Sequence, residues 1–180
     1  MMQEKRITVA TTWLDGCSGC HMSLLDIDDR LIALAEKVDF VYSPLVDAKE
    51  LPAQVDVGII EGSVSTDEDA EKARKFRKSC TYLISLGDCA VAGNVPAMRN
   101  LFKLKDVMAR AYIENVTTNP QLPVIDVPKL LETVQPVHGI VSVDMYIQGC
   151  PPSADAIWHV LSELIEGRTP DPMKLTRFGA

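Results

Sequence analysis

Residues Val55–Cys89 read VDVGIIEGSVSTDEDAEKARKFRKSCTYLISLGDC, and this stretch decides the fold. Its two apolar segments, at 55–60 and 80–86, are short and rich in residues that favour buried strands. Between them, Ser65 or Thr66 predicts the N-cap of a helix whose first turn is acidic and whose last turn is basic, as the helix dipole favours. A strand, a capped helix and a second strand predict a parallel βαβ unit.

The same alternation extends along the rest of the chain. Apolar residues at helical spacing predict a helix over 21–37, and Ser153 predicts the N-cap of a last helix that ends near Glu166. Three more segments predict strands, at 5–12, 40–45 and 143–147. We therefore expect a single α/β domain over 1–180, a flavodoxin-like doubly wound fold with a mainly parallel five-stranded sheet and helices on both faces.

Two stretches depart from this alternation. Residues 94–136 contain five prolines, and a stretch of this length is long for a crossover between strands. We therefore expect an irregular insertion here, with one or two helices between 97 and 116. The stretch at 167–180 predicts an extended, irregular C-terminal tail.

Composition excludes several classes of protein. The net charge is −7, which argues against binding to nucleic acid or to anionic membranes. No apolar run is long enough to span a bilayer, and the N-terminus resembles neither an export signal nor a twin-arginine signal, so we expect a cytoplasmic location. Five cysteines, an odd number without an export signal, argue against a disulfide framework.

Four of the cysteines follow predicted strands. Cys17 and Cys20 come after the first strand, Cys89 after the fourth and Cys150 after the fifth, and glycines flank them. Because the carboxyl ends of parallel strands meet at one edge of a sheet, we expect these thiols to converge. Cys80 begins a strand without a glycine neighbour, and we interpret it as a buried structural thiol.

Four converging thiolates bind either a zinc ion or a cubane iron–sulfur cluster. Structural zinc sites are usually made of two local pairs of ligands, whereas this chain has one pair and two single cysteines. The spacing therefore favours a cluster and leaves zinc as the alternative.

Four motifs carry a family resemblance. They are WLDGCSGC at 13–20, IEGSV at 60–64, GDCA at 87–90 and GCPP at 149–152. In this order they resemble the small subunit of [NiFe]-hydrogenases, and most of all the short small subunit of cytoplasmic bidirectional NAD-reducing hydrogenases. The homologous 20 kDa-type subunit of complex I shares the GCPP element but typically has adjacent cysteines in its first loop.

The resemblance implies one proximal [4Fe–4S] cluster, bound by Cys17, Cys20, Cys89 and Cys150, and no catalytic residue in this chain. Partner chains would hold the other cofactors: the [NiFe] centre in a large subunit, and FMN and NAD(H) in iron–sulfur and flavin diaphorase subunits. The chain would then carry electrons between those partners in the reaction H2 + NAD+ = H+ + NADH. Glu61, at the same sheet edge, is a possible proton relay.

Other readings stay open. One alternative is the small subunit of a hydrogenase with another electron acceptor, and a second is the small subunit of a complex I type quinone oxidoreductase. A flavodoxin-like FMN carrier and a structural-zinc module are more distant alternatives. Beside the ligands, Asp15 and Asp88 are candidates for orienting the loops, His21 for contacting the cluster environment, and Trp13 for lining a partner interface.

Overall fold

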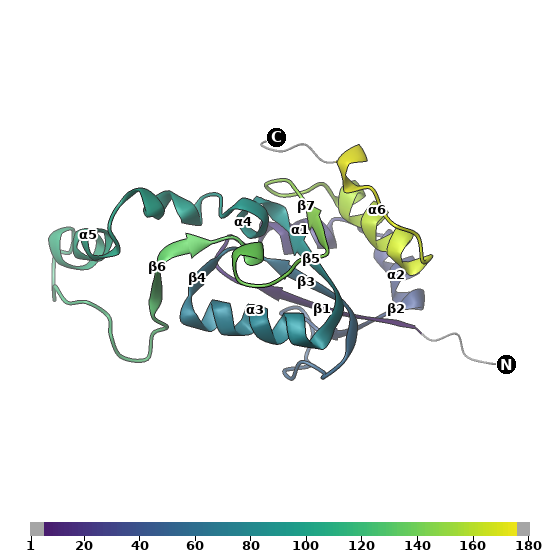
Figure 1. Ribbon diagram of the computed structural model, residues 1–180, viewed down its shortest axis with the longest axis horizontal. Helices are drawn as coiled ribbons and strands as arrows, with labels where there is room; N and C mark the ends of the chain where they lie inside the picture. Colours follow the sequence, from purple (N-terminus) through teal and green to yellow (C-terminus); the bar gives the residue numbers. More distant parts are fainter. Residues whose placement is uncertain (1–5, 176–180) are drawn as a thin grey trace.

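The computed structural model describes residues 6–175, and a parallel five-stranded sheet forms its centre (Figure 1). The strand order is β2-β1-β3-β5-β7, and every neighbouring pair is parallel. This order and the helices around the sheet confirm the predicted flavodoxin-like fold. The strands are β1 (Ile7–Trp13), β2 (Val38–Tyr42), β3 (Val55–Glu61), β5 (Cys80–Leu86) and β7 (Met145–Ile147). Lys5, where the first strand was expected to begin, lies outside the described residues.

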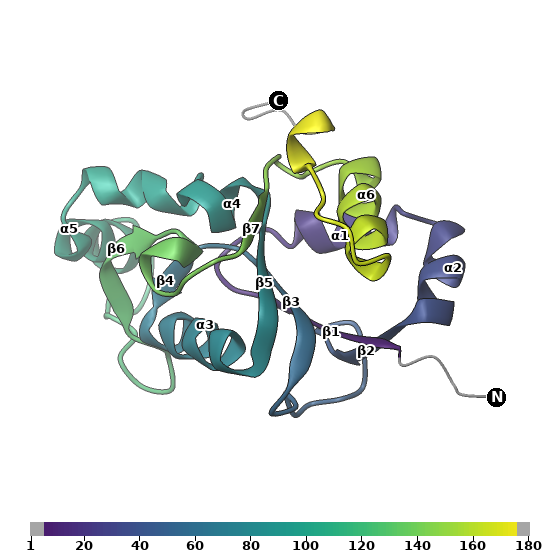
Figure 2. The same cartoon turned by 45° about the vertical axis from the view of Figure 1, so that its right-hand side comes forward.

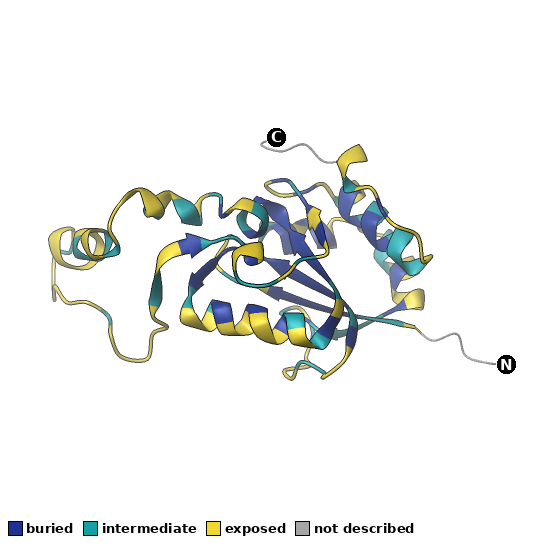
Figure 3. Cartoon of the chain, in the orientation of Figure 1, coloured by how far each residue is buried: buried dark blue, intermediate teal, exposed yellow. Residues whose placement is uncertain are grey.

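Helices cover both faces of the sheet (Figure 2). On one face lie α1 (Gly19–Leu25), α2 (Arg30–Lys37) and α6 (Ala154–Ile165), whose apolar side chains pack with those of the strands into one core cluster. On the other face, α3 (Asp67–Ser79) and α4 (Gly87–Ala92) pack into a second cluster. The central strands β3 and β5 are therefore mostly buried, as Figure 3 shows, which explains their continuous apolar sequences, whereas the edge strand β2 is only partly buried.

Two predicted helix starts are confirmed by their caps. Thr66 is the N-cap of α3, and it forms a capping box with Asp69, in which each side chain accepts a hydrogen bond from the other residue's backbone N–H. Ser153 caps α6 by accepting a hydrogen bond from the backbone N–H of Ala156.

The prediction of one continuous helix over 21–37 is wrong. The chain forms α1, a turn and then α2, and Asp28 in the turn has φ 59°, in the left-handed region. Aspartate tolerates that region better than most residues, and a run of Asp-Ile-Asp-Asp favours a turn. The apolar spacing continues through the break because Ile27 is itself buried in the core.

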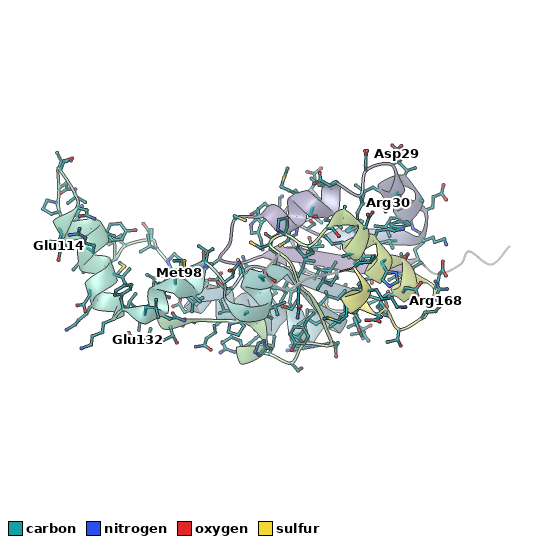
Figure 4. The ribbon with its side chains drawn as sticks, turned by 90° about the horizontal axis from the view of Figure 1, so that it is seen from above. Asp29, Arg30, Met98, Glu114, Glu132 and Arg168 are labelled. Atoms are coloured by element: carbon teal, nitrogen blue, oxygen red, sulfur yellow. The ribbon has the colours of Figure 1, made fainter. Side chains whose placement is uncertain are left out.

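The proline-rich stretch extends away from the sheet. Residues 95–129, which we call the arm, contain η1 (Pro96–Leu101), α5 (Leu104–Ala109) and η2 (Arg110–Glu114). The chain then returns through β6 (Leu130–Gln135), which pairs antiparallel with β4 (Val64–Thr66), and through η3 (Val137–Gly139). In Figure 4 the labelled Met98 and Glu114 of the arm lie far from Arg30 and Arg168 at the other end of the molecule.

The C-terminal stretch contains one short turn, η4 (Pro172–Lys174), and its last residues, 176–180, lie outside the described residues. Within the described part of the chain, no helix is long and apolar enough to cross a membrane.

Candidate metal centre

All four cysteines of the predicted site lie at the carboxyl edge of the sheet. Cys17 is in the loop after β1, and Cys150 is in the loop after β7. The other two are helical, which differs from the loops expected: Cys20 lies in the first turn of α1, and Cys89 lies within α4. Helical positions fix the direction of these two thiols more tightly than loops would.

Two of the four thiols are affected by the charges of the others. Burial raises the pKa of the Cys20 thiol well above its usual range, and the negative charges of Glu61 and of the other three thiolates raise it further. Burial also raises the pKa of Cys89, with added repulsion from Cys150 and Cys17. Such effects require charges close together, so the other thiols lie near Cys20 and Cys89.

Two glycines make room for the sulfur atoms. At Gly87, where φ is +83°, a Cβ atom would lie 2.2 Å from the Cys20 Sγ, which no side chain can do without moving the sulfur. At Gly19, a Cβ atom would lie 3.2 Å from the Cys17 Sγ. The backbone around the thiols is therefore closely fitted to the sulfurs themselves.

Asp88 joins two of the ligand segments. Its backbone N–H donates to the Gly149 carbonyl over 2.9 Å, and its side-chain Oδ1 accepts from the Gly149 N–H over 2.8 Å. This pair of bonds fixes α4, which carries Cys89, against the loop that carries Cys150. Asp88 thus orients the loops, as its position in the sequence suggested.

Glu61 is buried at the end of β3 and supports the first ligand helix. Its carboxylate accepts hydrogen bonds from the backbone N–H groups of Cys20, over 3.3 Å, and of His21, over 2.8 Å. It also bonds the His21 ring at Nδ1. These contacts satisfy free N–H groups at the start of α1 and place a carboxylate there, which the helix dipole favours. The role of Glu61 as a proton relay stays a prediction.

His21 continues this network into the sheet. Its Nε2 lies 2.9 Å from the Thr11 Oγ1, and that hydroxyl donates to the Ser43 Oγ over 2.8 Å. The four side chains of this hydrogen-bonded network, Glu61, His21, Thr11 and Ser43, are all buried. His21 was expected near the cluster environment, whereas Thr11 and Ser43 were not predicted, because single hydroxyl residues in strands carry no distinguishing pattern.

Asn94 was also not predicted. Its side-chain Nδ2 donates a hydrogen bond to the Cys150 Sγ over 3.3 Å. The residue follows Gly93, and both have positive φ, +38° at Asn94 and +86° at Gly93. A Gly-Asn pair after a helix is a turn signal, but the sequence does not show that the turn aims the amide at a thiol.

The remaining candidates lie elsewhere or have structural partners. Asp15 accepts a hydrogen bond from the Ser65 hydroxyl, and Trp13, which is 38% exposed, contacts the His21 ring edge to face at 5.4 Å. Cys80 lies at the opposite end of the sheet, buried and apart from the other thiols. The structure does not bring it into the site.

A family model matches most of the chain. Residues 17–164, from the first cysteine of the site almost to the end of α6, match the model described as "NADH ubiquinone oxidoreductase, 20 Kd subunit". The chain belongs to this family. Family membership implies an iron–sulfur cofactor, in agreement with the donor set of four thiols.

Individual relatives come from hydrogenases. The NAD-reducing hydrogenase HoxS subunit delta of Cupriavidus necator is 44% identical over 98% of this chain and 87% of its own length. The F420-non-reducing hydrogenase of Methanothermobacter marburgensis has a subunit that is 41% identical over 92% of this chain, which spans only 55% of that relative. These family members confirm the resemblance to hydrogenase small subunits.

A solved structure shares the whole fold. The chain matches a chain in the crystal structure of an NAD+-reducing [NiFe]-hydrogenase in the H2-reduced state, with a TM-score of 0.92 and 41% identity. The match covers 97% of this chain and 99% of that one. The arm and the candidate metal centre therefore both lie within the matched region.

Proposed function

We propose that this chain is the electron-transfer small subunit of an NAD-reducing [NiFe]-hydrogenase and that Cys17, Cys20, Cys89 and Cys150 hold one [4Fe–4S] cluster. The observation that carries the proposal is that the segments bearing these four thiols meet at one edge of the sheet: Gly87 lies against the Cys20 Sγ, and Asp88 ties α4 to the Cys150 loop. The charges of the other thiolates also raise the pKa of Cys20. The similarity to the NAD-reducing relative and to the solved NAD+-reducing enzyme supports the hydrogenase assignment. The cytoplasmic location stays a prediction.

The chemistry of the donor set fits a cluster. Burial and neighbouring charges raise the pKa of Cys20 and of Cys89, so these two thiols do not ionise readily unless bound cations stabilise the thiolates, and iron does this. When bound, a [4Fe–4S] cluster stores and releases one electron at a time. Cys17 and Cys150 are exposed and Cys20 is buried, so the site has one open side and one side closed by the protein.

The order of the cysteines in the sequence favours the cluster over structural zinc, because they form one local pair and two single ligands rather than two local pairs. Among residues 6–175, no three His, Cys, Asp or Glu side chains are arranged to hold a single metal ion. A zinc ion requires its sulfurs at about 2.3 Å from one centre. Cysteines that bind different iron atoms of one cluster stand farther apart and still form one site.

The surrounding residues hold the ligands and control their environment. Glu61 fixes the start of α1, and Asp88 ties α4 to the Cys150 loop. The buried side of the site lowers the local dielectric constant, and the glycines let the backbone approach the sulfurs. Burial and hydrogen bonding to sulfur are two of the factors by which a protein sets a cluster's reduction potential.

The proposal assigns the other cofactors to partner chains. A large subunit would hold the [NiFe] centre, and diaphorase subunits would hold FMN and NAD(H). This chain would pass electrons from the first to the second during hydrogen oxidation, and in reverse during hydrogen evolution. The relatives named for hydrogenases support this arrangement.

We extend the proposal to the arm, which we expect to contact the large subunit. Val124 and Ile125 are more than three-quarters exposed, and an apolar groove of about 590 Å³ lies between α5 and the segment 123–130. Large exposed apolar surfaces usually mark protein interfaces. The arm begins directly after Asn94, which contacts Cys150, so it leaves the body beside the open side of the site.

Limited proteolysis tests this part of the proposal. The arm should be cut in the isolated subunit and protected in the complex. Equal cleavage in both would contradict the assignment.

The main test compares cysteine variants in the complex, purified without oxygen. Cys89→Ser should lose the iron of this site, the electron paramagnetic resonance signal of its reduced cluster and hydrogen-driven NAD+ reduction. The matched Cys80→Ser variant should keep all three. If Cys80→Ser alone emptied the site, the ligand assignment would be wrong.

The acceptor is tested separately. The family model is named for a ubiquinone oxidoreductase, so a quinone is the competing acceptor. Reduction of a quinone but not of NAD+ by the hydrogen-treated complex would favour the complex I type reading.

A further inference from the structure

The structure contains one side-chain hydrogen bond to the sulfurs of the site. Within residues 6–175, the Asn94 amide is the only side chain found to donate to any of the four thiols, over 3.3 Å to the Cys150 Sγ. Asn94 also lowers the pKa of Cys89, against the effects of burial and of the neighbouring thiolates, so its amide lies near that thiol as well.

The local backbone explains how the amide reaches the sulfurs. Gly93 ends α4 in the left-handed region, and Asn94 follows in the same region with φ +38°. The Asn94 carbonyl then accepts from the Ala97 N–H over 3.1 Å, which turns the chain into η1 and the arm. Two consecutive left-handed residues reverse the chain beside Cys150, and asparagine is one of the few residues that tolerates this conformation.

The position has consequences for charge at the site. An amide N–H directed at a ligand sulfur stabilises negative charge on it, and the reduced cluster carries one more negative charge than the oxidised one. A donor at this place therefore favours the reduced state, whereas its removal favours the oxidised state. Asn94 is only partly buried and Cys150 is exposed, so this donor lies on the open side of the site.

We propose that Asn94 is a positioning residue that raises the reduction potential of the cluster by donating its amide to the Cys150 sulfur. This inference rests on the proposed function of the four cysteines. It adds a determinant of the driving force for electron transfer on the side of the site that faces away from the sheet.

Two variants separate the amide from the backbone. Asn94→Gly keeps the left-handed conformation at no steric cost and removes the donor. Asn94→Asp has nearly the same shape and replaces the donor by a negative acceptor. Asn119→Gly is the matched control, because Asn119 is another asparagine with positive φ, +52°, in the arm.

The measurement is a redox titration of the intact complex, monitored by electron paramagnetic resonance, together with the iron content. At a fixed ambient potential, the ratio of reduced to oxidised cluster should fall by up to about tenfold in Asn94→Gly, because the bond stabilises the reduced cluster more than the oxidised one and only this difference changes the ratio. It should fall further in Asn94→Asp and stay unchanged in Asn119→Gly.

The outcomes separate this inference from the proposed function. A complete cluster with an unchanged potential in both Asn94 variants would overturn the role of Asn94 and leave the function standing. Loss of iron in both variants would also overturn it, because Asn94 would then hold the site together rather than tune it. A wild-type complex without iron at this site would overturn the proposed function itself.

Discussion

The two ends of β5 carry cysteines with opposite properties. Cys80 is the first residue of the strand, and its Sγ packs so closely on Gly58 that a Cβ atom there would lie 2.4 Å away. Burial raises the pKa of Cys80 to about 11, with Arg77 opposing the shift, and no other thiol of the described residues contributes. Cys89, just beyond the other end of β5, has thiol neighbours that add to its shift. The same residue type is thus a core side chain at one end of the strand and a candidate ligand at the other.

The difference comes from topology rather than from the cysteines themselves. Parallel strands bring their carboxyl ends, and the loops and helices that follow, to one edge of the sheet. The amino ends meet at the opposite edge, where Cys80 lies without a partner thiol among residues 6–175. Variants at the two edges should therefore have different effects, and these effects can be ranked.

The largest effect is expected from Gly87→Ala. The new Cβ would overlap the Cys20 Sγ at 2.2 Å, and the residue would be held at a φ of +83°. The combined strain should cost at least about 2 kcal/mol of stability, and the complex should lose the iron of this site. Thermal unfolding and iron analysis of the purified complex measure the two effects.

Gly167→Ala is the matched control for this prediction. Gly167 also has a positive φ, +69°, but a Cβ atom there would have no neighbour within 4 Å. The control should cost no more than about 1–2 kcal/mol and keep all the iron. Equal iron loss in both variants would show that backbone strain, not the fit to the sulfur, governs the site.

The second largest effect is expected from Glu61→Ala. Removing the carboxylate leaves the buried N–H groups of Cys20 and His21 without their acceptor, which should cost about 1–3 kcal/mol. Glu71 is exposed in α3, and Glu71→Ala should change the free energy of unfolding by no more than about 0.5 kcal/mol. Urea unfolding of both variants measures the difference, and equal stabilities would contradict the capping role of Glu61.

A smaller, pH-dependent effect is expected at Cys80. Because its pKa in the folded state is about 11, against about 9 in the unfolded state, the folded protein keeps a proton that the unfolded chain releases. This contribution to stability is complete below pH 9 and is lost as the pH rises to 11. The unfolding free energy of the wild type should therefore fall more steeply over this range than that of Cys80→Ala. Parallel curves would show that Cys80 ionises normally.

The smallest effect on stability is expected in the arm. Ile125→Asp changes a side chain that is 79% exposed. The free energy of unfolding of the isolated subunit should therefore stay within about 0.5 kcal/mol of the wild-type value. The same change should weaken assembly with the large subunit, measured by size-exclusion chromatography of the mixed chains. Unchanged assembly would argue that the arm contacts no partner through this residue.

The sequence predicts the strands well because they depend on strong local patterns, and it predicts the positions of the four cysteines after strands. The buried parallel strands β3 and β5 are continuous apolar segments, and Thr66 with Asp69 is a recognisable capping box. The placement of Cys17, Cys20, Cys89 and Cys150 at one edge of the sheet follows from the order of strands and helices alone.

Other features depend on contacts between distant residues. The break at Asp28 interrupts a helical pattern that continues across it, because Ile27 stays in the core. The pairing of β4 with β6 joins two short segments across the arm and has no local signal. The contacts of Glu61 with His21, and of Asn94 with Cys150, join residues 40 and 56 positions apart, respectively.

Iron-edge anomalous diffraction from crystals of the complex, grown without oxygen, tests the central claim most directly. We expect anomalous density within bonding distance of the sulfurs of Cys17, Cys20, Cys89 and Cys150 and none beside Cys80. Density that leaves any of these four sulfurs unbound, or no iron signal at this edge of the sheet, would contradict it.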